Sequence, residues 1–237
     1  MNHRRLLQLK TLMNNASQEE NVRLEPNSKP YLIKRLIADA FDILVVFILF
    51  MTLSNVLLST PLANTYNEHY GNYKEIERNV IEQYGNDINE IGTEEKKAIS
   101  ETLNNDQHYL DERFAANLHS YLLKLLAGFI AEAVVFLIIP LILKTRGTLG
   151  KLLMKIMPFC ERKQTRATIP SIIGKFAFVF IIDSAFLYLF TGIYTFILVP
   201  VIRLIEMLLN KKNKTICDAL SGVTIIERLS YNGIYKF

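Results

Sequence analysis

The 237-residue sequence has only two cysteines, no tryptophan, ten glycines and seven prolines. Two cysteines are too few for a disulfide-rich secreted module or for a four-cysteine zinc site. None of the four histidines belongs to a His-Glu-x-x-His pattern, and no Gly-x-Ser-x-Gly elbow occurs. Residues 1–30 carry too many charges for a secretory signal peptide. We therefore expect a protein that is not an enzyme and needs no cofactor.

Long apolar runs are the main feature that the sequence does have. Each reaches the roughly 17 to 25 residues that a helix needs to cross about 30 Å of hydrocarbon. The last run extends from Ile169 to Asn210, about twice the length of one crossing, so we divide it at Thr191-Gly192. The sequence predicts transmembrane helices at residues 31–58 and 121–143, and two more within residues 172–209.

The distribution of Lys and Arg predicts the orientation of these helices, because cytoplasmic flanks carry an excess of basic residues. Residues 1–35, 144–175 and 203–237 are net positive, whereas residues 59–120 contain five basic and twelve acidic residues. Both termini are therefore expected in the cytoplasm, and the net charge of +4 reflects topology, with no indication of nucleic acid binding. The expected fold is an all-α polytopic membrane protein with four transmembrane helices and an extracytoplasmic helical segment. Its other parts are a cytoplasmic N-terminal segment (1–30), the outer segment (59–120), a basic cytoplasmic connection (144–171) and a cytoplasmic tail (210–237).

The outer segment is polar and has the pattern of a helix. The run from Thr93 to Leu103 places apolar residues on one side, and Thr93 is a suitable N-cap. We expect this segment to fold as a small helical cap.

Charged side chains inside the predicted spans carry the strongest functional signal. A charge near the centre of a span costs about 2.5 to 3.5 kcal/mol on insertion scales, so it must face protein, water or another charge. Arg35, Asp39 and Asp42 follow the spacing i, i+4, i+7 and form one stripe on the first helix. Glu132 and Asp183 add a carboxylate to the second and third helices. Convergence of Asp42, Asp183 and Glu132 predicts an ion or proton site.

A structural role is the alternative for these charges. Arg35 could pair with Asp39 and Asp42, and the other two carboxylates could accept hydrogen bonds that fix the assembly of the helices. Arg203 and Glu206 have the spacing of a surface pair that extends toward the interface.

Charges near the ends of the spans are expected at the membrane boundary. Lys175 suits an anchoring role there, and residues 147–156 have the pattern of an amphipathic stretch on the inner membrane surface. Asp218 suits a local N-cap or turn.

Four sequence features occur together in an order that resembles the RDD family of bacterial membrane proteins. They are Lys34-Arg35 followed by Asp42, then Gly147-Thr148-Leu149-Gly150-Lys151, then Ile169-Pro170-Ser171, and finally Asp218-Ala219-Leu220-Ser221-Gly222. The resemblance covers about residues 30–228. It assigns the family's arginine to Arg35, one aspartate to Asp42 and the other to Asp218, with Asp183 as the competitor. Val223 and Lys175 depart from residues that are common in the family.

The resemblance implies a location in the plasma membrane of a bacterium and offers two functions. Some members of the family are reported as sodium/proton antiporters, and others are thought to partner membrane proteins. We therefore expect monovalent cation/proton exchange, with Na⁺ and H⁺ as candidate ions, and a homo-oligomer because four spans are few for a transporter. The alternative is an accessory or regulatory subunit that binds a membrane-protein partner through its outer segment.

Overall fold

The structure is a computed structural model that describes residues 29–85, 92–160, 165–210 and 213–227. These residues are mostly helical. The chain divides into two compact units, one made of residues 1–48 and 130–237 and the other of residues 49–129. We call them the core unit and the outer unit.

Three helical stretches are long and apolar enough to cross a membrane, namely Tyr31–Leu58, Gln107–Ile142 and Ile169–Leu209. The first lies within helix α2 (Lys29–Leu58). The second is built from α5 (Gln107–Glu132), the π-helical segment η2 (Ala133–Ile138) and α6 (Ile139–Ile142). Many of their large apolar side chains point outward, including Ile48 at 55% exposure and Ile142 at 76%. An apolar surface of this extent requires lipid around it, so the chain is a membrane protein.

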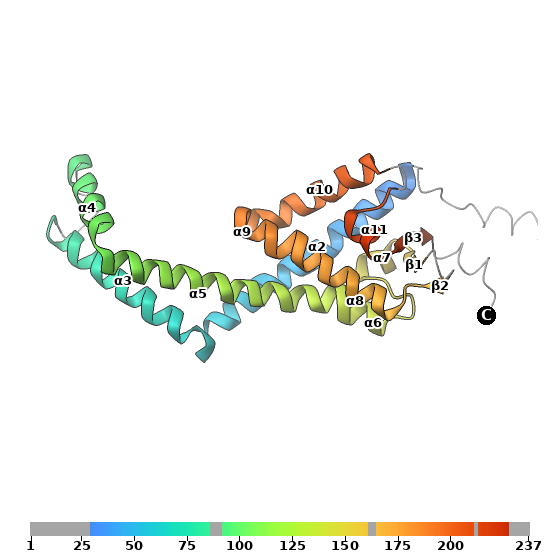
Figure 1. Cartoon of the computed structure of the whole chain (residues 1–237), viewed down its shortest axis with the longest axis horizontal. Coiled ribbons are helices and arrows are strands. Elements are labelled where there is room, and N and C mark those ends of the chain that lie inside the picture. Colours follow the sequence, from blue (N-terminus) through green and yellow to red (C-terminus); the bar gives the residue numbers. More distant parts are fainter. Residues whose placement is uncertain (1–28, 86–91, 161–164, 211–212, 228–237) are drawn as a thin grey trace, which may run out of the picture. The chain divides into compact units, whose positions relative to one another are not determined.

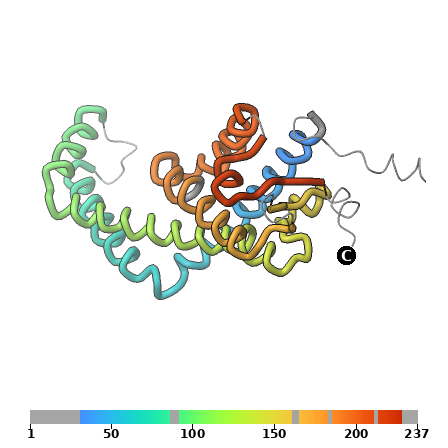
Figure 2. Tube along the Cα trace, turned by 45° about the vertical axis from the view of Figure 1, so that its right-hand side comes forward, coloured from blue at the N-terminus to red at the C-terminus, as the bar shows by residue number. Residues whose placement is uncertain are grey.

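The third apolar stretch is bent. It consists of α8 (Ile169–Phe178), the π-helical segment η3 (Val179–Phe186), α9 (Leu187–Thr191), the short 3₁₀ turn η4 (Gly192–Tyr194) and α10 (Thr195–Leu209). Gly192 has φ 56° and ψ −132°, a conformation that ends the helix and that glycine adopts without steric cost. Figures 1 and 2 show the chain reversing near η4, and α10 contacts both η3 and α9.

A three-stranded antiparallel sheet stands where only helices and connections were expected, so the all-α class is wrong in this part. Its order is β2-β1-β3, with β1 at Ile156–Cys160, β2 at Thr165–Arg166 and β3 at Val223–Glu227. The central register pairs Ile156 with Glu227 and Cys160 with Val223. The basic connection between the second and third apolar stretches therefore joins the chain's C-terminal part in one sheet.

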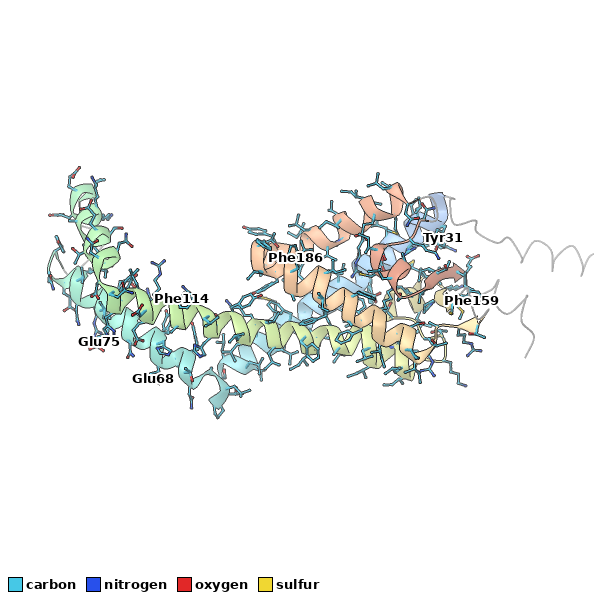
Figure 3. All side chains as sticks on the ribbon, viewed as in Figure 1. Tyr31, Glu68, Glu75, Phe114, Phe159 and Phe186 are labelled. Carbon is cyan, nitrogen blue, oxygen red and sulfur yellow. The ribbon has the colours of Figure 1, made fainter. Side chains whose placement is uncertain are left out.

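The hydrophobic core of the core unit lies where this sheet meets the first and third apolar stretches. Ile156 and Ile225 from the sheet, Tyr31 and Ala38 from α2, and Ile172 from α8 are all buried there. Burial of each large apolar side chain contributes about 1.5 to 3 kcal/mol. Figure 3 shows Tyr31 and Phe159 at the same end of this unit.

The outer unit has a small core of its own. It contains the end of α2, η1 (Pro61–Ala63), α3 (Asn64–Glu82), α4 (Thr93–Asn105) and most of α5. Contacts between α3 and α5 include the His69–Glu112 pair at 2.8 Å and an edge-to-face contact of Tyr73 with Tyr109. Burial raises the pKa of Tyr73 above its ordinary value. The buried members of this core are Val80, Ile99, Leu103 and Tyr109.

Helix α4 begins at Thr93 as expected, but its N-cap is the residue before. Gly92 takes the extended N-cap conformation, and its backbone N–H donates to the Glu95 carboxylate at 2.8 Å. The expected role of Thr93 as the N-cap is therefore wrong by one residue.

Candidate functional site

A buried cluster forms around Asp42 at the point where α2 meets α7 (Leu149–Leu153). Asp42 has no exposed surface, and its carboxylate accepts from the Thr148 hydroxyl and from the Gly150 backbone N–H, the latter at 2.8 Å. The Lys151 ammonium donates to Asp42 at 3.4 Å and to Asp39 at 3.1 Å. Lys151 thus bridges two carboxylates that lie on one face of α2, and we call Asp39, Asp42, Thr148 and Lys151 the Asp42 cluster.

Close approach of the two backbones makes this cluster possible. A Cβ atom added at Gly150 would stand 2.1 Å from the carbonyl oxygen of Ala38, so only glycine allows α7 to lie this close to α2. Thr148 precedes the helix with an extended backbone, which directs its side chain and the first backbone N–H groups of α7 toward Asp42. An anionic side chain at a helix start is favoured by those unpaired N–H groups.

The second buried cluster is centred on Asp218. Its carboxylate accepts from the Arg35 guanidinium on one oxygen and from the Lys175 ammonium on the other. Arg35 also donates to the Asn213 carbonyl at 2.5 Å, and the Asp218 backbone N–H donates to the Thr215 hydroxyl at 3.2 Å. We call Arg35, Lys175 and Asp218 the Asp218 cluster.

Helix α11 (Ile216–Leu220) holds Asp218 in place for this contact. Thr215 caps its start, and Gly222 follows its end with φ 67°, a left-handed conformation that suits glycine. The chain then enters β3, whose Ile225 carbonyl accepts from the Tyr31 hydroxyl at 2.8 Å. Glu227 accepts from Lys34 at 2.6 Å. Three residues of α2, Tyr31, Lys34 and Arg35, therefore bond the C-terminal part of the chain.

Together the two clusters contain three cationic and three anionic side chains, so their formal charges cancel. Arg35, Asp39, Asp42, Lys151 and Asp218 are all buried, which makes every unpaired charge expensive. Any change in protonation or loss of one charge therefore has to be compensated within the clusters.

A narrow pocket reaches both clusters. Thr148 and Lys151 of the Asp42 cluster and Lys175 of the Asp218 cluster line it, together with Arg146. Its other lining residues are Phe136, Pro140, Gly147, Pro158, Ala167, Ser171, Ile172 and Val223.

The structure gathers the residues on which the family resemblance rests. Arg35, Asp42, Thr148, Gly150, Lys151 and Asp218 belong to the clusters or make their bonds, Gly147 lines the pocket, and Gly222 ends α11. Asp218 is the aspartate bonded to Arg35. The backbone of Asp183 lies in η3, and its side chain falls outside the described parts of the structure.

Several expected pairings are replaced by others. The cation bonded to Asp42 is Lys151, whereas Arg35 bonds Asp218 instead of Asp42. Lys151 is 3% exposed, so this side chain does not lie on the surface, whereas Leu153 and Lys155 of the same stretch are exposed. Lys175 bonds Asp218, a partner that its predicted anchoring role did not include. These pairings join segments more than 100 residues apart in two cases, which local spacing does not reveal.

Arg203 and Glu132 are both buried, at 7% and 5% exposure. The Arg203 guanidinium lies 5.6 Å from the centre of the Phe136 ring, a cation–π contact, so its expected surface position is wrong. Glu132 is the last residue of α5 and directly precedes η2. Within residues 29–85, 92–160, 165–210 and 213–227, no three His, Cys, Asp or Glu side chains form a group that could hold a metal ion.

No family model, curated protein or solved structure matches the chain. The resemblance to the RDD family therefore stays a prediction, and the functional argument depends on the geometry of the two clusters.

Proposed function

We propose that the chain is a membrane protein of the RDD kind that exchanges a monovalent cation for a proton at the Asp42 cluster. The observation that carries this proposal is the oxygen shell around the Lys151 ammonium. Its nitrogen lies 3.1 Å from Asp39 Oδ1, 3.4 Å from Asp42 Oδ2 and 3.2 Å from Thr148 Oγ1. Carboxylate and hydroxyl oxygens are the ligands that hard cations prefer.

An ammonium ion and an alkali-metal ion would compete for this position. Two buried carboxylates on one helix face repel each other and need a positive charge between them. When Lys151 is protonated, its ammonium supplies that charge. When Lys151 loses its proton, an alkali-metal ion on the same three oxygens restores the charge. The exchange is then one proton for one monovalent cation, and the net charge of the cluster stays constant.

The pocket gives the Asp42 cluster a connection to its surroundings. Thr148 and Lys151 belong to its lining, so an ion that enters the pocket meets two members of the cluster. The bias of Lys and Arg in residues 144–175 would place this end of the core unit at the cytoplasmic side. In this proposal the parts of the third stretch before and after η4 cross the membrane separately, which gives four spans with both termini in the cytoplasm. The transporter would work as a homo-oligomer.

The decisive experiment measures proton flux in proteoliposomes with a pH-sensitive dye and pulses of Na⁺, Li⁺ or K⁺. Wild type is expected to give a cation-dependent signal, and Asp42→Asn and Lys151→Met are expected to abolish it. Lys155→Met is the matched control, because Lys155 is exposed, lies four residues away and loses the same charge. Thr148→Val removes one of the three oxygens and should weaken the apparent cation affinity without abolishing the flux. Unchanged flux in Asp42→Asn and Lys151→Met would refute the proposal.

The accessory or regulatory role is the second candidate, and the outer unit favours it. This unit has its own hydrophobic core, and Phe114 on α5 is 70% exposed (Figure 3). If the outer unit binds a partner membrane protein, deletion of residues 70–112 should remove function, and Asp42→Asn should have little effect. If exchange is the function, the deletion should preserve the flux signal that Asp42→Asn removes.

A further inference from the structure

A second hollow lies at the end of the second apolar stretch. Three cationic residues line it, Lys144 and Arg146 from the segment after α6 and Arg166 from β2. The remaining lining residues are Leu141, Ile142 and Leu143, so no acidic residue of the described parts of the chain lines it. The hollow thus combines a positive wall with an apolar wall.

The two arginines are held in place by backbone carbonyls at and just after the end of the helix. Arg146 donates to the Leu141 carbonyl in the last turn of α6 at 2.8 Å, and Arg166 donates to the Lys144 carbonyl at 3.0 Å. The first of these bonds satisfies a carbonyl that the end of the helical stretch leaves without a partner inside the helix. Each guanidinium carries five N–H groups in a planar fork, a geometry that suits two oxygens of one phosphate. The arginines are therefore ordered before any ligand arrives, which lowers the entropic cost of binding.

The depth of the hollow indicates the source of the phosphate. Ile142 is the last residue of the apolar stretch and is 76% exposed, as expected for a side chain in contact with lipid tails. Lys144 follows two residues later, at the depth where lipid headgroups begin. A free phosphate would gain nothing from the apolar wall of Leu141, Ile142 and Leu143. A phospholipid could place its phosphate on the arginines and its first methylene groups along that wall.

We propose that this hollow binds the headgroup phosphate of an anionic phospholipid. Lys144, Arg146 and Arg166 neutralise the phosphate, and Ile142 contacts the acyl chain. This site is distinct from the Asp42 cluster, and its occupancy does not depend on whether the chain transports ions.

Native mass spectrometry of the detergent-purified full chain tests the proposal. Phosphatidylglycerol and phosphatidylcholine with the same acyl chains are titrated separately, and inorganic phosphate is added as a competitor in a third series. Each basic residue near anionic lipid contributes about a fivefold factor in affinity. Phosphatidylglycerol should therefore bind at least tenfold more tightly than phosphatidylcholine, and millimolar phosphate should not displace it.

Two variants and a matched control complete the test. Arg146→Gln/Arg166→Gln should weaken phosphatidylglycerol binding about 25-fold. Because both arginines also bond backbone carbonyls, Lys144→Gln provides a variant that leaves those bonds intact, and it should weaken binding about fivefold. Arg78→Gln/Lys97→Gln removes two exposed cations from the outer unit and should change binding less than twofold.

Three results would overturn the proposal. Equal binding of the two lipids would mean that the charge of the headgroup is not recognised. Displacement by inorganic phosphate would mean that the hollow is a site for the free ion. Unchanged binding in Lys144→Gln and in the double arginine variant would place the lipid elsewhere.

Discussion

Substitution of Asp218 by Asn should destabilise the core unit far more than removal of the Lys175 charge. Asp218 holds Arg35 and Lys175 together, and the side chains of Arg35 and Asp218 are 2% and 1% exposed. Asp218→Asn leaves both cations without their anion. Removal of one partner from a buried ion pair costs about 3 to 5 kcal/mol, so we expect a loss of about 4 kcal/mol in the free energy of unfolding.

Lys175→Met should have a much smaller effect. The Lys175 side chain is 21% exposed, and Asp218 keeps its bond to Arg35 in this variant. We expect a loss of about 1 kcal/mol, closer to that of a surface ion pair. Combining the two substitutions removes one of the cations that Asp218→Asn leaves unpaired. The double variant should therefore be more stable than Asp218→Asn by about 1 kcal/mol.

The two cysteines provide an assay that reads the core unit alone. Cys160 and Cys217 are the only cysteines of the chain, and both are buried free thiols in this unit. A fluorogenic thiol-reactive dye therefore reports unfolding of the core unit during a thermal scan in detergent. At about 3 °C per kcal/mol, Asp218→Asn should lower Tm by about 12 °C and Lys175→Met by about 3 °C. Equal losses in the two single variants, or losses that add in the double variant, would refute the reasoning.

Four other substitutions test the packing. Gly150→Ala should cost about 3 kcal/mol because its Cβ would overlap the Ala38 carbonyl, and Gly174→Ala, with no atom within 4 Å, should be neutral or stabilising in the same thiol-dye scan. Tyr31→Phe leaves a buried carbonyl of β3 without its donor and should cost about 1 to 2 kcal/mol, measured by chemical unfolding. Ile99→Ala should cost about 2 to 5 kcal/mol and make the outer unit sensitive to limited proteolysis, while the thiol-dye transition stays at the wild-type temperature. A Gly174→Ala loss as large as that of Gly150→Ala would contradict the packing argument.

Local sequence patterns were insufficient to predict the three-stranded sheet. Residues 156–160 contain Pro158, which cannot donate to a ladder and argues against a central strand. The strand forms nevertheless, because β3 supplies a partner from about 65 residues later in the chain. The run at residues 223–227 has the apolar composition of a strand. Which strand it pairs with is decided only when the chain folds.

The ion pairs likewise depend partly on local spacing and partly on contacts between segments far apart in the sequence. The spacing of Arg35, Asp39 and Asp42 correctly places their side chains on one face of α2, but it favours pairing among neighbours. In the structure the bonds of Arg35 and Asp42 go to segments that follow by more than 100 residues. The signal that could have indicated this was Lys151, a charge that directly follows Gly150, whose small size permits close backbone contact.

By itself, the sequence predicted a membrane protein, because it contains apolar runs long enough to cross a bilayer. It also predicted that Arg35, Asp39 and Asp42 must avoid lipid, since they lie on one side of the first run, but it placed Lys151 and Arg203, which are buried, at the surface. Tertiary structure alone decided which charge neutralises which. Ion pairing inside a protein depends on distances of a few ångströms between helices, and these are set by features such as the contact of Gly150 with Ala38.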